Sequence, residues 1–182
     1  MKERWVLLLL GAWWMGSLVL LVVAPTNFRL IDELLAHSGS QSFHSVVERV
    51  GHDTTRELLR YLSSELNRKF FLLWNVVQVG MGLALVWLSR ALPAARRVGA
   101  ALLVAAALVG VLLIVQPVIT RLGRSLDFVP RQPPPPALAQ FQLLHVAYTA
   151  IELLKLVALA LAALWSLRAA PRAAATASPG PA

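Results

Sequence analysis

The sequence predicts an all-α polytopic membrane protein, a four-helix transmembrane bundle with an amphipathic helical extramembrane insertion between its first and second spans. Its 182 residues are 58% hydrophobic and only 14% charged, whereas globular proteins carry about 25% charged residues. Four apolar runs are long enough to cross a hydrocarbon core as helices, at about 5–24, 70–88, 98–120 and 143–167.

The net charge of +8 does not indicate nucleic-acid binding. Many of the arginines flank apolar runs and gather on no single soluble face. We therefore expect the lipid bilayer to be the main partner and expect no nucleic-acid partner. Assembly into a homo-oligomer or with a membrane-complex partner is possible from the sequence. The chain has no cysteine, which excludes disulfides, iron–sulfur clusters and thiolate zinc sites.

The first apolar run follows Lys2 and Arg4, as a secretory signal would. It is about 20 residues long, however, and the hydrophobic part of a signal peptide has about 7–15. Pro25 directly after the small residue Ala24 also disfavours cleavage. We interpret 5–24 as an uncleaved first span.

Residues 26–69 differ from the rest because acidic and basic side chains balance and apolar residues recur at helical spacing. Breaks are expected at 37–40 and at 51–53, with Asp53 as the N-cap of the following helix. We predict an insertion that lies on the bundle or on the membrane surface. Its last helix, from about Thr54, is expected to continue unbroken into the second span.

The second half of the chain is simpler. A short basic loop precedes the third span, which is expected to close at Gln116 and Pro117. A polar loop at 121–140 contains four consecutive prolines, typical of a stiff polyproline spacer. Residues 1–168 then form one membrane domain, and the Ala- and Pro-rich 169–182 is expected to be a disordered tail.

Basic residues orient the spans. One side of the four-span topology holds Lys2, Arg4, Arg90, Arg96, Arg97, Arg168 and Arg172. The positive-inside rule makes this side cytoplasmic, so we expect a cell (inner) membrane protein with both termini in the cytoplasm. If the arginines of 121–131 are counted instead, the rule predicts the opposite orientation in the membrane.

Polar residues recur at matching depth in three spans, which predicts a polar layer in the outer half of the bundle. Glu152 and Lys155 are central, because ionisable groups inside a membrane must be paired or wetted. The candidate ligand-binding residues are Asn75, Gln78, Gln116, His145, Tyr148, Glu152 and Lys155, with Thr149 beside them. No catalytic residue and no metal site is predicted.

Each of these residues also has a structural interpretation. Amides such as Asn75 and Gln78 commonly hydrogen-bond between membrane helices, and Glu152 and Lys155 have the i, i+3 spacing of a helical ion pair. His145 lies near the outer interface, where a lone histidine is more often a hydrogen-bonding group than a metal ligand.

Four segments resemble the domain-of-unknown-function 4149 family, which is similar to transmembrane protein 205 and loosely related to the copper-resistance D-like group. They are VVAPTNFR (22–29), LLRYLSSELNRKFFLLWNVVQ (58–78), LIVQPVITRLG (113–123) and FQLLHVAYTAIELLKL (141–156). The resemblance implies a four-helix bundle with no settled activity. Some four-span members of the wider group handle haem or porphyrin through intramembrane histidines, but this chain has no histidine in its first span.

Three functions follow as hypotheses. The first is a non-enzymatic membrane protein whose polar layer binds or conducts a small ligand or proton, alone or as a subunit of a complex. The second is a haem- or porphyrin-binding redox protein that uses His145, with His52 as a distant second ligand; no other cofactor is expected. The third is a scaffold that docks a partner through 26–69.

Overall fold

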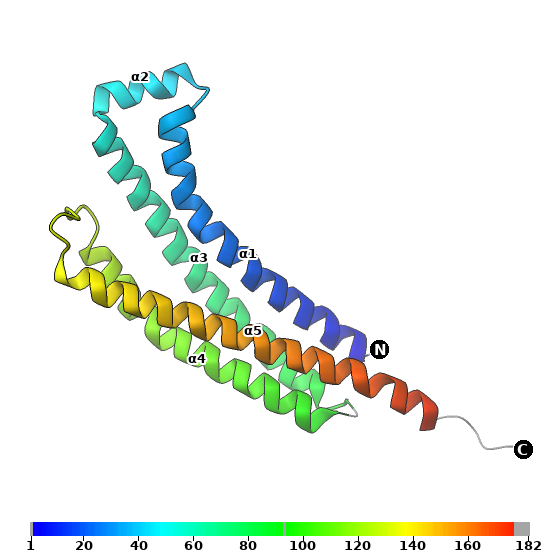
Figure 1. The fold of residues 1–182 in the computed structure, drawn as a ribbon. Helices are drawn as coiled ribbons and strands as arrows, with labels where there is room; N and C mark the ends of the chain where they lie inside the picture. Colours follow the sequence, from blue (N-terminus) through cyan, green and yellow to red (C-terminus); the bar gives the residue numbers. More distant parts are fainter. Residues whose placement is uncertain (1, 93, 177–182) are drawn as a thin grey trace, which may run out of the picture.

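A computed structural model describes residues 2–92 and 94–176, with side chains described as far as Arg168. The described residues are helical apart from short connections and contain no strand. The five helices are α1 (Lys2–His37), α2 (Gln41–Val50), α3 (His52–Ser89), α4 (Ala95–Ser125) and α5 (Pro136–Thr176) (Figure 1). Four of them, all except α2, are long and apolar enough to cross a membrane. The all-α, four-span prediction is confirmed.

The four long helices form a ring in which α1 packs on α3 and α5, and α4 packs on α3 and α5. The dry core lies toward the end of the bundle where α1 begins. Its largest members are Trp13, Leu85, Leu102 and Leu159, which are almost fully buried. Most remaining apolar side chains of these helices are exposed, as expected for surfaces that face lipid.

Helix α1 continues beyond residue 24, the predicted end of the first span. Pro25 lies inside α1, so the carbonyl of Leu21 has no N–H to accept at that point of the helix. The helix continues to His37 and then breaks, as expected, before α2. Residues 26–37, α2 and the first part of α3 together form an arm that rises beyond the α4–α5 loop, with α2 across its tip (Figure 1).

The break between α2 and α3 is a single residue, Gly51, with φ +93°. This left-handed region favours glycine. Gly51 also occupies the N-cap of α3, which has no side-chain cap. The prediction that Asp53 caps this helix is wrong: Asp53 lies inside the first turn, where its charge still favours the helix dipole.

Helices α3, α4 and α5 extend beyond the spans predicted from the sequence. Helix α3 has 38 residues without a break, as predicted for this segment. Helix α4 continues through Pro117 to Ser125. Pro136 opens α5, a position that does not need the missing N–H. The loop therefore covers only 126–135 instead of 121–140. The expected disordered tail is helical to Thr176, and 177–182 lie outside the described residues.

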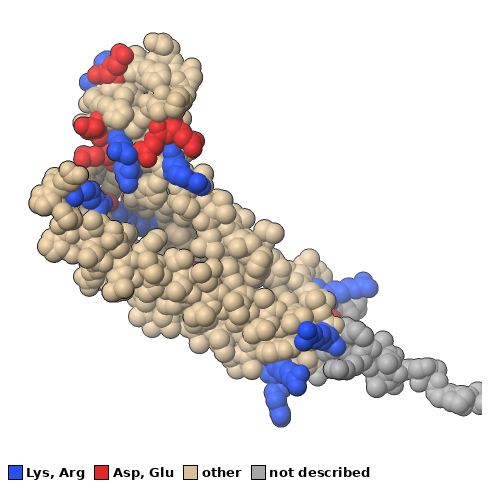
Figure 2. Space-filling view, in the orientation of Figure 1, with Lys and Arg blue, Asp and Glu red and all other residues tan. Residues whose placement is uncertain are grey.

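Charges separate along the molecule (Figure 2). The end of the molecule that holds the start of α1 and the connection from α3 to α4 carries mainly lysine and arginine. The arm carries both acidic and basic side chains. The surface between them is nearly free of charge in this view. This distribution is typical of a protein that crosses a membrane along its long axis.

Candidate functional site

A chain of buried hydrogen bonds joins all four long helices halfway along the bundle. At its centre Lys155 of α5 donates to three oxygens: Ser17 Oγ at 3.0 Å, Glu152 Oε2 at 2.5 Å, and Gln78 Oε1 in a very short contact. Lys155 and Gln78 are fully buried. The indole of Trp13 donates to the same Gln78 oxygen at 2.8 Å. Lys155 therefore ties α5 to α1 and α3 at one point.

The network continues from Gln78 toward the arm. The Gln78 amide donates to Asn75 Oδ1 at 3.0 Å, and the Asn75 amide donates to Gln116 Oε1 at 2.6 Å and to the Tyr148 hydroxyl oxygen at 3.2 Å. Asn75 is 0% exposed, so each of its bonds is made away from water. This half of the network connects α3 with α4 and α5.

A cavity of about 450 Å³ lies directly against this network. All four long helices line it, between the network and the base of the arm. Its apolar wall comes mostly from α1, and its polar floor from α3, α4 and α5. Its polar lining side chains are Ser64, Asn67, Arg68, Thr120, Gln116, His145, Tyr148, Thr149 and Glu152. Figure 2 shows the molecule hollowed where the arm leaves the bundle.

Glu152 is the unusual member of this site. One carboxylate oxygen accepts from Lys155, but the other, Oε1, has no hydrogen-bond partner. Among the described side chains it is the one buried polar atom left unpaired. The Glu152 side chain is only 6% exposed and lines the cavity. An unpaired buried acceptor is costly, so this oxygen favours a donor within the cavity.

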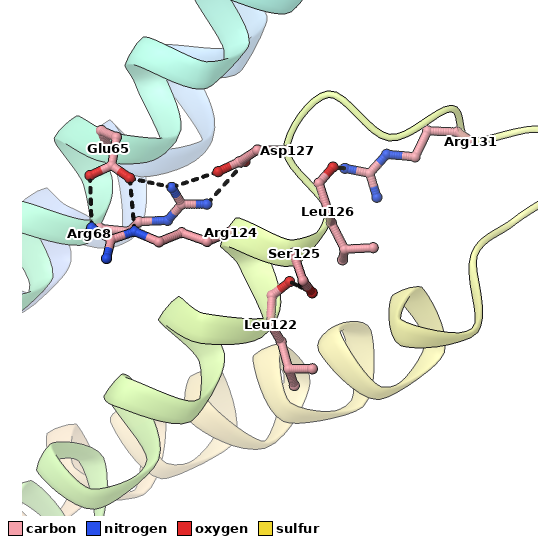
Figure 3. Close-up of polar contacts among 8 residues, drawn as sticks. All are labelled: Glu65, Arg68, Leu122, Arg124, Ser125, Leu126, Asp127 and Arg131. Atoms are coloured by element: carbon pink, nitrogen blue, oxygen red, sulfur yellow. Dashed lines mark hydrogen bonds and ion pairs between the residues drawn. The ribbon is translucent and has the colours of Figure 1, made fainter.

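A four-residue cluster of charges joins α3 to the end of α4 and the loop that follows it (Figure 3). Arg68 forms a bidentate pair with Asp127 at 3.0 and 3.1 Å and also bonds Glu65 at 2.6 Å. Arg124 makes a second bidentate contact with Glu65, at 3.1 and 3.2 Å. We call these four residues the charge clip. It holds the start of the 126–135 loop against α3.

The clip changes the acidity of its members. Hydrogen bonds from Arg124 and Arg68 lower the pKa of Glu65 below its ordinary value. Burial alone would lower the pKa of Arg68, but its bonds to Asp127 and Glu65 outweigh burial and raise it. The pKa of Arg124 is raised by Glu65. Glu65, Arg68 and Arg124 are therefore charged at neutral pH.

The structure brings together most of the residues that the sequence singled out. Asn75, Gln78, Gln116, Tyr148, Glu152 and Lys155 form one buried network. Thr149 lines the cavity, with its hydroxyl bonded to the His145 carbonyl at 3.0 Å. His145 stands apart from the network, exposed at the rim of the cavity and stacked on Phe141.

His52 does not approach His145. It is the first residue of α3, and the first cavity-lining residue of that helix is Ser64. The turns of α3 between His52 and Ser64 span about 18 Å along the helix axis, at ~1.5 Å per residue. His52 therefore lies beyond the cavity at whose rim His145 is found. Within the described residues no group of three or more histidines or carboxylates is placed to hold a metal ion.

Sequence reasoning missed the clip and the indole of Trp13. Glu65 and Arg68 precede the second span, while Arg124 and Asp127 follow the third. Opposite charges at the same depth on antiparallel neighbours were the available signal. Trp13 had no such signal, because only the packing of α1 on α3 brings its N–H to Gln78.

No protein-family model, curated protein or solved structure matches this chain.

Proposed function

We propose that this chain is a multi-pass membrane protein that binds a small ligand in the cavity lined by its four long helices, with Glu152 as the polar anchor. The observation that carries the proposal is the unpaired Glu152 Oε1, a buried acceptor on a side chain that lines an open cavity. Leaving such a group without a donor costs about 1–3 kcal/mol, and more when it is charged. A bound molecule that donates to this oxygen would recover that cost.

The size and lining of the cavity support the same function. Small-molecule sites typically occupy about 300–1,000 Å³ and combine apolar walls with few polar groups. This cavity has about 450 Å³, with Leu20, Leu21 and Phe28 on one side and Tyr148 and Glu152 on the other. The cavity is therefore large enough for a ligand of modest size.

Binding is favoured over conduction because the cavity has a blind inner end. Beyond Lys155 the described core is apolar, with Leu10, Leu85 and Leu159 packed together. Two buried serines lie there, but Ser89 and Ser166 bond carbonyls of their own helices at 3.0 and 2.8 Å. A proton or polar solute would find no chain of described polar side chains through this layer.

The proposed orientation places both termini in the cytoplasm and the arm outside a cell (inner) membrane, on the basis of the basic residues near the ends of α1, α3 and α4. Membership of the domain-of-unknown-function 4149 family is part of the same proposal and rests on the four segments quoted above. In this orientation the cavity lies in the outer half of the bundle.

Native mass spectrometry of the protein purified in mild detergent tests the proposal. We expect a small-molecule adduct on the wild type that is lost in Thr149→Trp, which fills the cavity. Leu153→Trp is the matched control, since Leu153 lies on α5 but is 51% exposed and does not line the cavity. Equal occupancy of all three proteins would overturn the proposal.

Proton flux into reconstituted vesicles distinguishes conduction. A flux that the wild type supports and Glu152→Gln abolishes would replace binding with proton transfer as the function.

A further inference from the structure

The cavity specifies its ligand more closely than the proposed function requires, and the following inference rests on that function. Glu152 Oε1 lacks a donor, while Oε2 is already bonded to Lys155 at 2.5 Å. A carboxylate oxygen accepts and does not donate. The ligand must therefore present an O–H or N–H group at the floor of the cavity.

Charge at the floor selects a neutral donor over a cation. Glu152 already has a counterion in Lys155, so the pair is neutral as it stands. The other ionised group on the cavity wall, Arg68, is offset by Asp127 and Glu65. A cationic ligand would leave a net positive charge in a region of low dielectric, which is costly. A hydroxyl donates without adding charge.

The walls indicate the body of the ligand. Aromatic rings approach the cavity from three helices, at Phe28, Phe71 and Phe141. The Phe71 ring meets the ring of Tyr148 edge-on, at 5.8 Å between centroids. Aromatic side chains favour stacked or edge-on contacts with other rings. A ring that bears the hydroxyl fits this lining.

The opening of the cavity indicates where the ligand comes from. The apolar core closes its inner end, and the clip joins α3 to the α4–α5 loop on a second side. Leu20 and Leu21 of α1 and Thr149 of α5 are among the residues that line the cavity. These residues belong to the apolar, membrane-spanning lengths of both helices. A ligand that passes between these lengths of α1 and α5 would come from the bilayer and not from the water.

We propose that the cavity binds a neutral, ring-bearing lipophile whose hydroxyl donates to Glu152 Oε1 and which enters from the membrane between α1 and α5. A long apolar substituent on such a ring would remain in the opening, in contact with lipid.

One photoreactive label and four competitors test the proposal on the full-length protein in nanodiscs. A photoreactive diazirine derivative of 4-octylphenol labels the site, and mass spectrometry locates the labelled residues. The competitors are 4-octylphenol, its methyl ether 4-octylanisole, and 4-octylbenzylamine, which is cationic at neutral pH. The ether has the shape of the phenol without its donor. A fourth competitor, 4-hydroxybenzenesulfonate, carries the hydroxyl but does not enter membranes.

We expect labelling on α1 and α5 around the cavity, and competition by the phenol at least about tenfold better than by the ether or the amine, as befits one hydrogen bond to a charged acceptor. The sulfonate should not compete. Equal competition by phenol and ether would overturn the donor assignment while ligand binding stands. Preference for the amine would overturn neutrality, and competition by the sulfonate would overturn entry from the bilayer. Labelling outside the cavity would overturn the proposed function as well.

Glu152→Gln gives a sharper test. The glutamine carbonyl oxygen is expected to turn toward Lys155, so that the amide NH₂ faces the cavity and becomes a donor. The preference for the phenol over the ether should then be lost, because the oxygens of both compounds can accept from the amide NH₂. Leu153→Ala on the lipid-facing side of α5 is the control and should keep the wild-type preference. Unchanged preference in a folded Glu152→Gln protein would contradict the proposal.

Discussion

The ammonium group of Lys155 lies 3.0 Å from the hydroxyl oxygen of Ser17, which joins the last membrane-spanning helix to the first across 138 residues of sequence. Ser17 also accepts from the indole of Trp74 at 3.3 Å. Three helices therefore meet at one small side chain. This contact lies just on the inner side of the cavity and closes the α1–α5 seam there.

Lys155→Met is expected to destabilise the protein by about 3–5 kcal/mol, because it leaves the Glu152 carboxylate buried without a counterion. Thermal unfolding in detergent measures the loss. The double variant Lys155→Met/Glu152→Gln carries no buried charge and should recover most of it. If the double variant is as unstable as the single one, the loss comes from packing and not from the unpaired charge.

Gly16→Ala should be destabilising, by about 1–3 kcal/mol as for other overpacked sites. A Cβ at this position would overlap the indole ring of Trp74. Gly11→Ala in the same helix is the control, since a Cβ there meets nothing within 4 Å, and it should be neutral or slightly stabilising. Equal stabilities for the two variants would mean that the ring moves aside freely.

Acidification should release the 126–135 loop. The folded protein lowers the pKa of Glu65 through its bonds from Arg124 and Arg68, so the clip contributes stability above the unfolded pKa of about 4.3. That contribution is lost as the pH falls through the lower, folded pKa. Hydrogen exchange of the loop, corrected for intrinsic rates, should therefore rise below about pH 4.3.

Glu65→Gln separates this effect from general acid unfolding. The variant should show faster loop exchange already at neutral pH, with little further change specific to the loop on acidification. A loop whose protection is the same in both proteins at every pH would show that the clip does not hold it.

Pro25→Ala should stabilise α1, because it restores a donor for the Leu21 carbonyl; proline inside a helix costs about 3 kcal/mol relative to alanine. We expect a higher unfolding temperature and a protected amide at position 25. Pro136→Ala is the control, since Pro136 opens α5 and its ring costs little there. An exposed, unprotected amide at position 25 would contradict the prediction.

The helices and the polar network were within reach of the sequence because both follow from periodicity and depth. Apolar runs define the spans, and Asn75, Gln116 and Glu152 recur at matching depth in antiparallel helices. The helix boundaries were less accessible. A proline ends a helix in many sequences, yet Pro25 and Pro117 both lie within helices, since side chains and neighbouring helices can satisfy freed backbone groups in a membrane.

The cavity was out of reach for a different reason. A cavity forms where the side chains of several helices leave space unfilled, and no single residue type predicts it. The position of Glu152 predicted that the side chain needs a partner, but only the structure reveals that Lys155 satisfies one oxygen and leaves the other free. The spread of α1 from α5 at this depth depends on the sizes of all four contacting faces.

The continuity of α1 and α3 has a mechanical consequence. Each is a single rod from the tip of the arm into the bundle, and the two are tied together by bonds such as Asn27 to Asn67 at 2.8 Å. Pro25, which lines the cavity, is the weak point of the first rod. A bend of α1 at Pro25 would therefore change the shape of the cavity. A movement of the arm would thus be transmitted along α1 to the wall of the cavity.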